Sequence, residues 1–298
     1  MKLALSNAML PSLDPEALIE KARAWGYDGL ELCGVHGEQR FLTTSSDLSP
    51  LRRSLADAGV TLLSVHTGLS FGHSPRRALE DRKRLVLELI ERAAEVGCRC
   101  VVVSGARIQK TVTKAMATTQ TSETLGELAL EAAKKRITLA IENAGVFAGS
   151  RELWYLCDAG GTAALRVCWN PLTSAIVRES PTLAVPRLAA SLAFVRLTDA
   201  VLGPRGEIER YVAIGRGAVA TPKLIQLLRG IAYSGWLCVH WPRDPQTDAA
   251  SADELFSSSA AYLRAELDKP VVELSAYKGD KNAPRFVTQA PDGASASP

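Results

Sequence analysis

Polar residues of this sequence stand where its apolar runs end, and several belong to types that transfer protons. Carboxylate and imidazole groups act as general bases and acids, and hydrogen-bond donors stabilise developing negative charge. The residues at the ends of eight apolar runs are Asn7, Glu31, His66, Ser104, Glu142 with Asn143, Asn170, Arg196 with Asp199, and His240. Any single one can instead be a strand end that binds a neighbouring backbone group. Together they predict one polar site, if the fold brings the run ends together.

The eight apolar runs are short and rich in β-branched residues, which is typical of buried strands. They begin at Leu3, Gly29, Thr61, Cys98, Ile137, Leu165, Leu192 and Trp236. Helical patterns lie between them, and one example is the i, i+3, i+4, i+7 series Val86, Leu89, Ile90 and Ala93. Eight alternations of strand and helix predict an α/β fold, a single (β/α)₈ TIM barrel, in which all strand ends meet at one mouth.

Capping residues and glycines predict where several helices begin and end. Asp14-Pro15 and Ser74-Pro75 each place a capping side chain before a proline, so helices are expected to start at those prolines. The predicted helix ends are followed by Gly26, Gly59 and Gly97.

The barrel is expected to span residues 1–269 as one domain. Apolar periodicity stops after Lys269, and residues 270–298 are predicted to form a disordered C-terminal tail. The segment from Gly203 to Gly217 is long for a loop between a strand and its helix. Because active sites of barrels are built from such loops, it is a candidate lid.

Composition excludes several classes of protein. The chain has 298 residues, of which 47% are hydrophobic and 22% charged, as in ordinary globular proteins. Its net charge of +3 is too small to indicate nucleic-acid binding, and no apolar stretch approaches a membrane span. The six cysteines form no CxxC motif and mostly fall inside apolar runs, where packed thiols are expected. We therefore expect a reduced, cytoplasmic protein. The sequence is compatible with a monomer and with an oligomer.

Seven motifs follow one another along nearly the whole barrel: LALSNAML, WGYDGLEL (Trp25 to Leu32), AIEN (Ala140 to Asn143), VCWNP, VRLTDA, IGRG (Ile214 to Gly217) and GWLCVHW. In their order and spacing the sequence resembles the xylose isomerase-like TIM barrels. That family includes sugar-phosphate isomerases and epimerases, hydroxypyruvate isomerases, inosose dehydratases and ketose 3-epimerases. Its DNA-cutting branch, the apurinic/apyrimidinic endonucleases, uses more histidines than the four present here.

The resemblance implies a divalent metal (Mn, Mg, Zn or Co) held by a Glu after strand five, an Asp after strand six, a His in strand seven and a Glu in strand eight. The equivalent positions here are Glu142, Asn170, Arg196 and His240, so only the first keeps its residue type. Arg196 has no lone pair to donate and stays protonated. Two unit charges about 4 Å apart interact by roughly 4 kcal/mol at an effective dielectric constant of 20. Because the positive charge of Arg196 would repel a metal ion, we expect a site without a metal and a protein without a cofactor.

An inward-facing Arg196 is expected to pair with Glu142 and neutralise it, as the metal does in relatives. The alternative is that Arg196 turns to the mouth and binds an anion. The resemblance implies transfer of a proton or a hydride next to a carbonyl. Without a metal, Glu142 is expected to be the base and His240, Arg196 or Asn170 the hydrogen-bond donor to an enolate. Pairing with Arg196 would also make Glu142 a weak base, because it favours the ionised carboxylate.

Six further residues are expected to line the bound substrate: Glu31, His66, Asn170, Asp199, Arg216 and Trp241. Arg216 lies between two glycines before a helix near Thr221, where a phosphate or carboxylate can bind, although a plain turn is the alternative. For His66 the alternative is a bond to a backbone carbonyl, and for Trp241 it is packing.

The sequence thus predicts a sugar or sugar-phosphate isomerase or epimerase with a remodelled, metal-free site. The alternative is a non-catalytic relative that only binds a carbohydrate, since a fold does not by itself imply activity. The expected partner is a small sugar or sugar phosphate, with no nucleic acid and no membrane.

Overall fold

The computed structural model describes residues 1–10, 13–33, 47–242 and 249–270. Eight parallel strands close into a barrel in the order β1-β10-β7-β6-β5-β4-β3-β2. These strands are β1 (Lys2–Ser6), β2 (Gly29–Cys33), β3 (Thr61–Phe71), β4 (Cys100–Gly105), β5 (Thr138–Glu142), β6 (Leu165–Trp169), β7 (Leu192–Leu197) and β10 (Trp236–Val239). Each contains or adjoins one of the eight predicted runs, and the predicted TIM barrel is confirmed.

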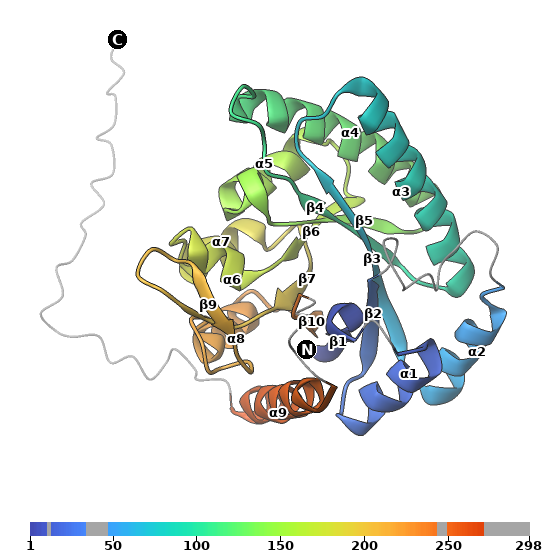
Figure 1. Cartoon of the computed structure of the whole chain (residues 1–298), viewed down its shortest axis with the longest axis vertical. Coiled ribbons are helices and arrows are strands. Elements are labelled where there is room, and N and C mark those ends of the chain that lie inside the picture. The colour runs from blue at the N-terminus through green and yellow to red at the C-terminus, as the bar shows by residue number, and fades with distance from the viewer. Residues whose placement is uncertain (11–12, 34–46, 243–248, 271–298) are drawn as a thin grey trace, which may run out of the picture.

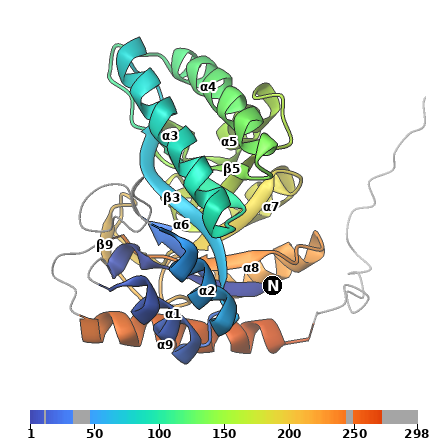
Figure 2. The ribbon, with the colours of Figure 1, turned by 90° about the vertical axis from the view of Figure 1, so that its right-hand side faces the viewer.

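Helices surround this barrel on its outside (Figures 1 and 2). They are α1 (Pro15–Ala24), α2 (Ser49–Ala58), α3 (Arg76–Val96), α4 (Lys114–Lys134), α5 (Ser150–Ala159), α6 (Pro171–Ile176), α7 (Pro181–Leu188), α8 (Thr221–Gly230) and α9 (Ala249–Asp268). In both views α9 lies beside α1, and the Lys21 Nζ atom is 2.7 Å from Asp253 Oδ1. The last helix therefore closes the outer ring against the first.

The inside of the barrel is filled by an apolar layer of small and medium side chains. This layer consists of Ala4, Leu63, Cys100, Val102, Ala140, Cys168, Phe194 and Cys238. A larger buried cluster lies between the strands and the helices. The barrel is thus a packed core.

Most predicted helix boundaries agree with the structure, with one correction. Asp14 caps α1, since its Oδ1 atom accepts the Ala17 N–H at 2.8 Å, and Gly59 and Gly97 end α2 and α3 with positive φ. The prediction that a helix starts at Pro75 under a Ser74 cap is wrong. Helix α3 starts at Arg76 with Pro75 as its N-cap, and the Ser74 hydroxyl oxygen accepts a hydrogen bond from Arg82 Nη1 instead of capping the helix.

The candidate lid is not an irregular loop. Strands β8 (Ala200–Leu202) and β9 (Ile208–Tyr211) pair antiparallel and form a hairpin directly after β7. The predicted tail lies outside the described residues from 271 onward. Within the described ranges, no helix is long and apolar enough to cross a bilayer.

Candidate functional site

The polar side chains at the mouth stand two residues beyond the apolar layer of the barrel. Side chains two apart on a strand share a face, so these also point inward. The pairs on successive strands are Ala4 and Ser6, Val102 and Ser104, Ala140 and Glu142, Cys168 and Asn170, Phe194 and Arg196, and Cys238 and His240. The period of the strands thus builds a polar layer on top of an apolar one.

Arg196 binds two carboxylates in this polar layer. Its Nη1 atom lies 2.8 Å from Glu142 Oε2, and its Nη2 atom pairs with Glu31 Oε2. The side chains of Arg196 and Glu31 are 1% and 0% exposed, and that of Glu142 is 13% exposed. Arg196 therefore faces inward and pairs with Glu142. This is the first of the two alternatives drawn from the sequence, and Arg196 does not turn to the mouth. The second partner, Glu31, was expected to line the substrate and is instead fully buried against Arg196.

The ion pairs keep both carboxylates charged. Burial by itself would raise the pKa of Glu142, but Arg196 and a hydrogen bond from His66 outweigh it and hold that pKa well below its ordinary range. Burial acts in the same direction on Glu31, and Arg196 again outweighs it, so the pKa of Glu31 is also lowered. Two carboxylates and one guanidinium leave this cluster with one net negative charge at neutral pH.

His66 and Ser104 complete the surroundings of Glu142. His66 Nε2 lies 3.4 Å from Glu142 Oε2, and Ser104 Oγ donates to the same oxygen at 3.2 Å. The Gly68 N–H donates to His66 Nδ1 at 3.1 Å, which assigns the proton of the neutral ring to Nε2. Arg196, Ser104 and His66 therefore all approach Oε2 of Glu142.

His240 lies across the mouth, immediately after β10. Its Nδ1 atom is 3.0 Å from the hydroxyl oxygen of Ser6 on β1. Burial, with the nearby Arg196 charge, lowers the pKa of His240 to about 4. The imidazole is therefore neutral at pH 7 and can either donate or accept a hydrogen bond.

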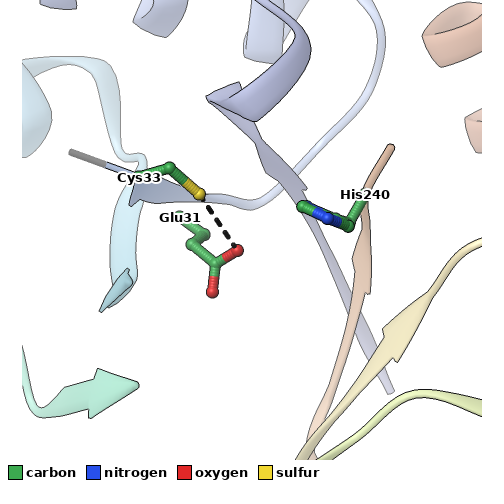
Figure 3. A group of neighbouring side chains, drawn as sticks. All are labelled: Glu31, Cys33 and His240. Carbon is green, nitrogen blue, oxygen red and sulfur yellow. Dashed lines mark hydrogen bonds between the residues drawn. The ribbon is translucent and has the colours of Figure 1, made fainter. Parts of the chain in front are cut away.

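A further group of three side chains, Glu31, Cys33 and His240, lies on the β1 side of the mouth (Figure 3). Cys33 is not among the residues that the sequence predicts for the site. One ligand atom from each of Glu31, Cys33 and His240 lies within 4.8 Å of the others. Cys33 Sγ is 3.9 Å from Glu31 Oε1 and 3.3 Å from Ser6 Oγ. The sequence held a signal for this group, because Glu31 and Cys33 are two apart on one strand and so share its inward face.

A sequence model of the xylose isomerase-like TIM barrel matches residues 19–266. The chain belongs to this family. The resemblance expected from the motifs is thereby confirmed over most of the barrel. No curated protein matches the chain.

Solved structures of the xylose isomerase-like fold superpose on the chain over almost its whole length. The IolI protein with a bound zinc atom has a TM-score of 0.80 and 16% identity, and covers 92% of this chain and 100% of its own. D-psicose 3-epimerase with D-fructose has a TM-score of 0.74 and 18% identity, with coverages of 90% and 100%. The 3-keto-D-glucoside 4-epimerase of E. coli has a TM-score of 0.72 and 16% identity, and covers 89% of this chain and 99% of its own. At these identities the likeness shows the fold.

The residues at the positions where the resemblance implies a metal do not fit one here. The guanidinium of Arg196 binds the carboxylate of Glu142, the one residue of this set that is expected to keep the type of a family ligand. Asn170 caps α6, because its Oδ1 atom accepts the Leu172 N–H at 3.1 Å, and its Nδ2 atom donates to Thr198. A divalent cation placed among these residues would be repelled by the positive charge of Arg196. The Oδ1 atom of Asn170 would also be a poor ligand, because it already accepts a hydrogen bond at the start of α6.

Asp199 organises a loop, which corrects its expected place against the substrate. The side chain is fully buried and accepts the backbone N–H groups of Ala200, Gly215, Gly217 and Val219 at 2.9 to 3.1 Å. Both oxygens are occupied, so the carboxylate fixes the turn that follows the β8-β9 hairpin. This is the physical reason why the long segment has a defined path.

Trp241 also packs in the core and does not form a wall of the mouth, contrary to expectation. It is fully buried, its indole N–H donates to the Val212 carbonyl at 3.2 Å, and its ring meets Phe256 edge-on at 5.1 Å. Arg216, in contrast, is exposed in the turn that Asp199 anchors. The titratable side chains that converge at the mouth, among the described residues, are therefore Glu31, Cys33, His66, Glu142, Arg196 and His240.

Proposed function

We propose that this protein is an isomerase or epimerase of a small carbonyl sugar or sugar phosphate, which moves a proton without a metal at the family's position. The observation that carries the proposal is the ion pair between Arg196 and Glu142, beside His66. Membership of the family and the structural similarity to sugar epimerases support the substrate class. Arg216, exposed in its turn, is the proposed contact for an anionic group of the substrate.

In the proposed reaction Glu142 is the base. Arg196, Ser104 and His66 approach Oε2, and we assign the proton transfer to Oε1. The substrate C–H bond next to the carbonyl breaks, its proton moves to Oε1, and the electron pair moves to the carbonyl oxygen. The neutral His240 imidazole donates a hydrogen bond to the resulting enolate oxygen. Return of the proton to the former carbonyl carbon, with transfer of the proton of the adjacent hydroxyl group to the enolate oxygen, gives an isomer. Protonation of the original carbon on its opposite face by water, whose hydroxide then takes the proton from Glu142, gives an epimer.

Arg196 is a positioning residue in this scheme, because its side chain is 1% exposed and both hydrogen-bonded nitrogens face carboxylates. It holds Glu142 in place and neutralises part of the buried negative charge, as a metal does in relatives. The lowered pKa of Glu142 makes it a weak base. The proton transfer therefore depends on stabilisation of the enolate by His240.

Exchange of substrate hydrogen with solvent deuterium tests the proposal. Chelator-treated protein is incubated in D₂O with ketoses, aldoses and their phosphates, and deuterium at the carbon next to the carbonyl is followed by NMR. We expect exchange with at least one compound and its loss in Glu142→Gln. The matched control is Glu152→Gln, a change at a carboxylate paired with Lys114 on the outer surface, which should leave exchange intact.

The second candidate function is carbohydrate binding without catalysis, favoured by the weak basicity that Arg196 imposes on Glu142. A thermal shift with a sugar but no deuterium exchange would support it. Exchange that persists unchanged in Glu142→Gln would also remove Glu142 as the base.

A further inference from the structure

We infer that Glu31, Cys33 and His240 form a binding site for a thiophilic divalent cation of the zinc class. This site shares only His240 with the metal position that the resemblance implies, because Glu31 and Cys33 come from β2 and Arg196 pairs with Glu142 at that position. It does not rest on the proposed function. The argument follows from the donor atoms, their surroundings and their charge.

The three donors are close to the spacing that a tetrahedral metal needs. Ligand atoms bound to zinc at about 2.0 to 2.3 Å lie about 3.3 to 3.8 Å from one another. Here Cys33 Sγ and Glu31 Oε1 are 3.9 Å apart, and all three ligand atoms lie within 4.8 Å of one another. Figure 3 shows the side chains of Glu31 and Cys33 facing that of His240 across the mouth. Small side-chain rotations therefore suffice to close the site.

The hydrogen bonds made by Glu31 leave its Oε1 atom available to bind a metal ion. Arg196 and Ser64 both donate to Oε2, the latter at 2.8 Å, while Oε1 faces the sulfur of Cys33. The Cys33 N–H donates to Asn7 Oδ1 at 2.6 Å, which fixes the end of β2. Such outer hydrogen bonds orient the ligands of metal sites and tune their affinity.

The charge of the cluster suits a dication bound through a thiolate. Glu31, Glu142 and Arg196 together carry one net negative charge. A divalent cation that displaces the Cys33 thiol proton adds one net positive charge and makes the whole group neutral. The carboxylates thus offset the repulsion that Arg196 exerts on the ion.

The donor set selects the kind of metal. Sulfur and imidazole ligands favour zinc and its chemical relatives, whereas Mg²⁺ and Ca²⁺ prefer oxygen ligands alone. Three protein ligands leave a fourth position for water or a substrate oxygen, as in catalytic zinc sites. The Ser6 hydroxyl oxygen lies between two of the ligands, 3.3 Å from Cys33 Sγ and 3.0 Å from His240 Nδ1.

Cobalt spectroscopy tests the site without substrate, so its result is independent of the proposed isomerisation. The reduced, chelator-treated full chain is titrated with Co²⁺ alone, and then with Zn²⁺ as the competitor. We expect a thiolate-to-cobalt charge-transfer band with the visible bands of a tetrahedral ion, both removed by Zn²⁺. Cys33→Ser should lose the charge-transfer band. Ser64→Ala should weaken Co²⁺ binding by about tenfold or more, as expected for an outer-shell change.

The matched control is Cys157→Ser, a change at a buried cysteine of α5 outside the mouth, which should retain the band. X-ray absorption of the zinc-loaded wild type needs no variant and guards against a misfolded Cys33→Ser. It should show one sulfur at about 2.3 Å with lighter ligands at about 2.0 to 2.2 Å. No cobalt band in the wild type, an unchanged band in Cys33→Ser, or zinc surrounded by nitrogen and oxygen only would each overturn the inference.

Discussion

Arg196 and Glu142 form an ion pair at the mouth of the barrel, with Nη1 2.8 Å from Oε2. The arginine comes from β7 and the glutamate from the end of β5, where related barrels are expected to place metal ligands. The guanidinium is shared with Glu31, so one buried cation serves two carboxylates. This arrangement has consequences for stability, for the response to acid and for metal binding.

Removal of the buried cation should destabilise the fold. We expect Arg196→Ala to lower the free energy of unfolding by about 3 to 5 kcal/mol, because it leaves two carboxylates buried without their partner. Urea denaturation followed by circular dichroism measures the change. Arg84→Ala, which removes the surface pair with Asp81, should give no measurable loss. A loss below about 1 kcal/mol in Arg196→Ala would contradict the pairing.

Acid should weaken the protein through Glu142. Its pKa is lowered in the folded state, so its contribution to stability is complete above the ordinary value of 4.5 and is lost as pH falls below it. Unfolding free energies measured from pH 7 to pH 3 should therefore fall less steeply in Glu142→Gln than in the wild type. The exposed Glu131→Gln should follow the wild type. Parallel curves for Glu142→Gln and wild type would refute the lowered pKa.

Asp199 should be essential to the turn after the hairpin. Asp199→Ala leaves four amide groups without their acceptor, so we expect a loss of at least about 2 kcal/mol in unfolding free energy. Hydrogen exchange of residues 214–219 should accelerate at the same time. The control, Asp158→Ala, changes an exposed acid of α5 and should alter neither quantity. Unchanged protection of 214–219 in Asp199→Ala would disprove the anchoring role.

Gly217 should resist substitution for a steric reason. An added Cβ atom would clash with the Asp199 carboxylate and with the Ala200 carbonyl oxygen, so Gly217→Ala should lower the melting temperature. At Gly230, on α8, an added Cβ meets no atom within 4 Å. Gly230→Ala should be neutral or stabilise by up to about 1 kcal/mol. Equal melting temperatures for the two variants would show that the turn adapts freely.

An imidazole in place of Arg196 should restore part of the family's metal site. In a Cys33→Ser background, which removes the thiol donor of the other site, Arg196→His should gain measurable Mn²⁺ binding by titration calorimetry. The affinity should stay modest, because Asn170 is neutral and caps α6. The comparison variant is Arg196→Gln, which supplies no imidazole and should bind less tightly. Absence of binding in both variants would show that charge is not what excludes the ion.

The sequence by itself determined the barrel and several of the residues at its mouth. Eight apolar runs alternating with amphipathic helices leave few other folds, and glycines after the helices mark where the chain turns back. Parallel strands place their carboxyl ends at one edge, so the polar run ends Glu142, Arg196 and His240 could be assigned to one site without coordinates.

Only the tertiary structure decided which of these residues touch. Arg196 and Glu31 are 165 positions apart, and their contact depends on the closure and stagger of the barrel, which local patterns do not encode. The same closure brings Cys33 opposite His240, and folding of the turn supplies three of the four amides that bind Asp199. Periodicity sets the face on which a side chain stands, whereas its partners depend on distances across the barrel, which follow from the packing of all eight strands.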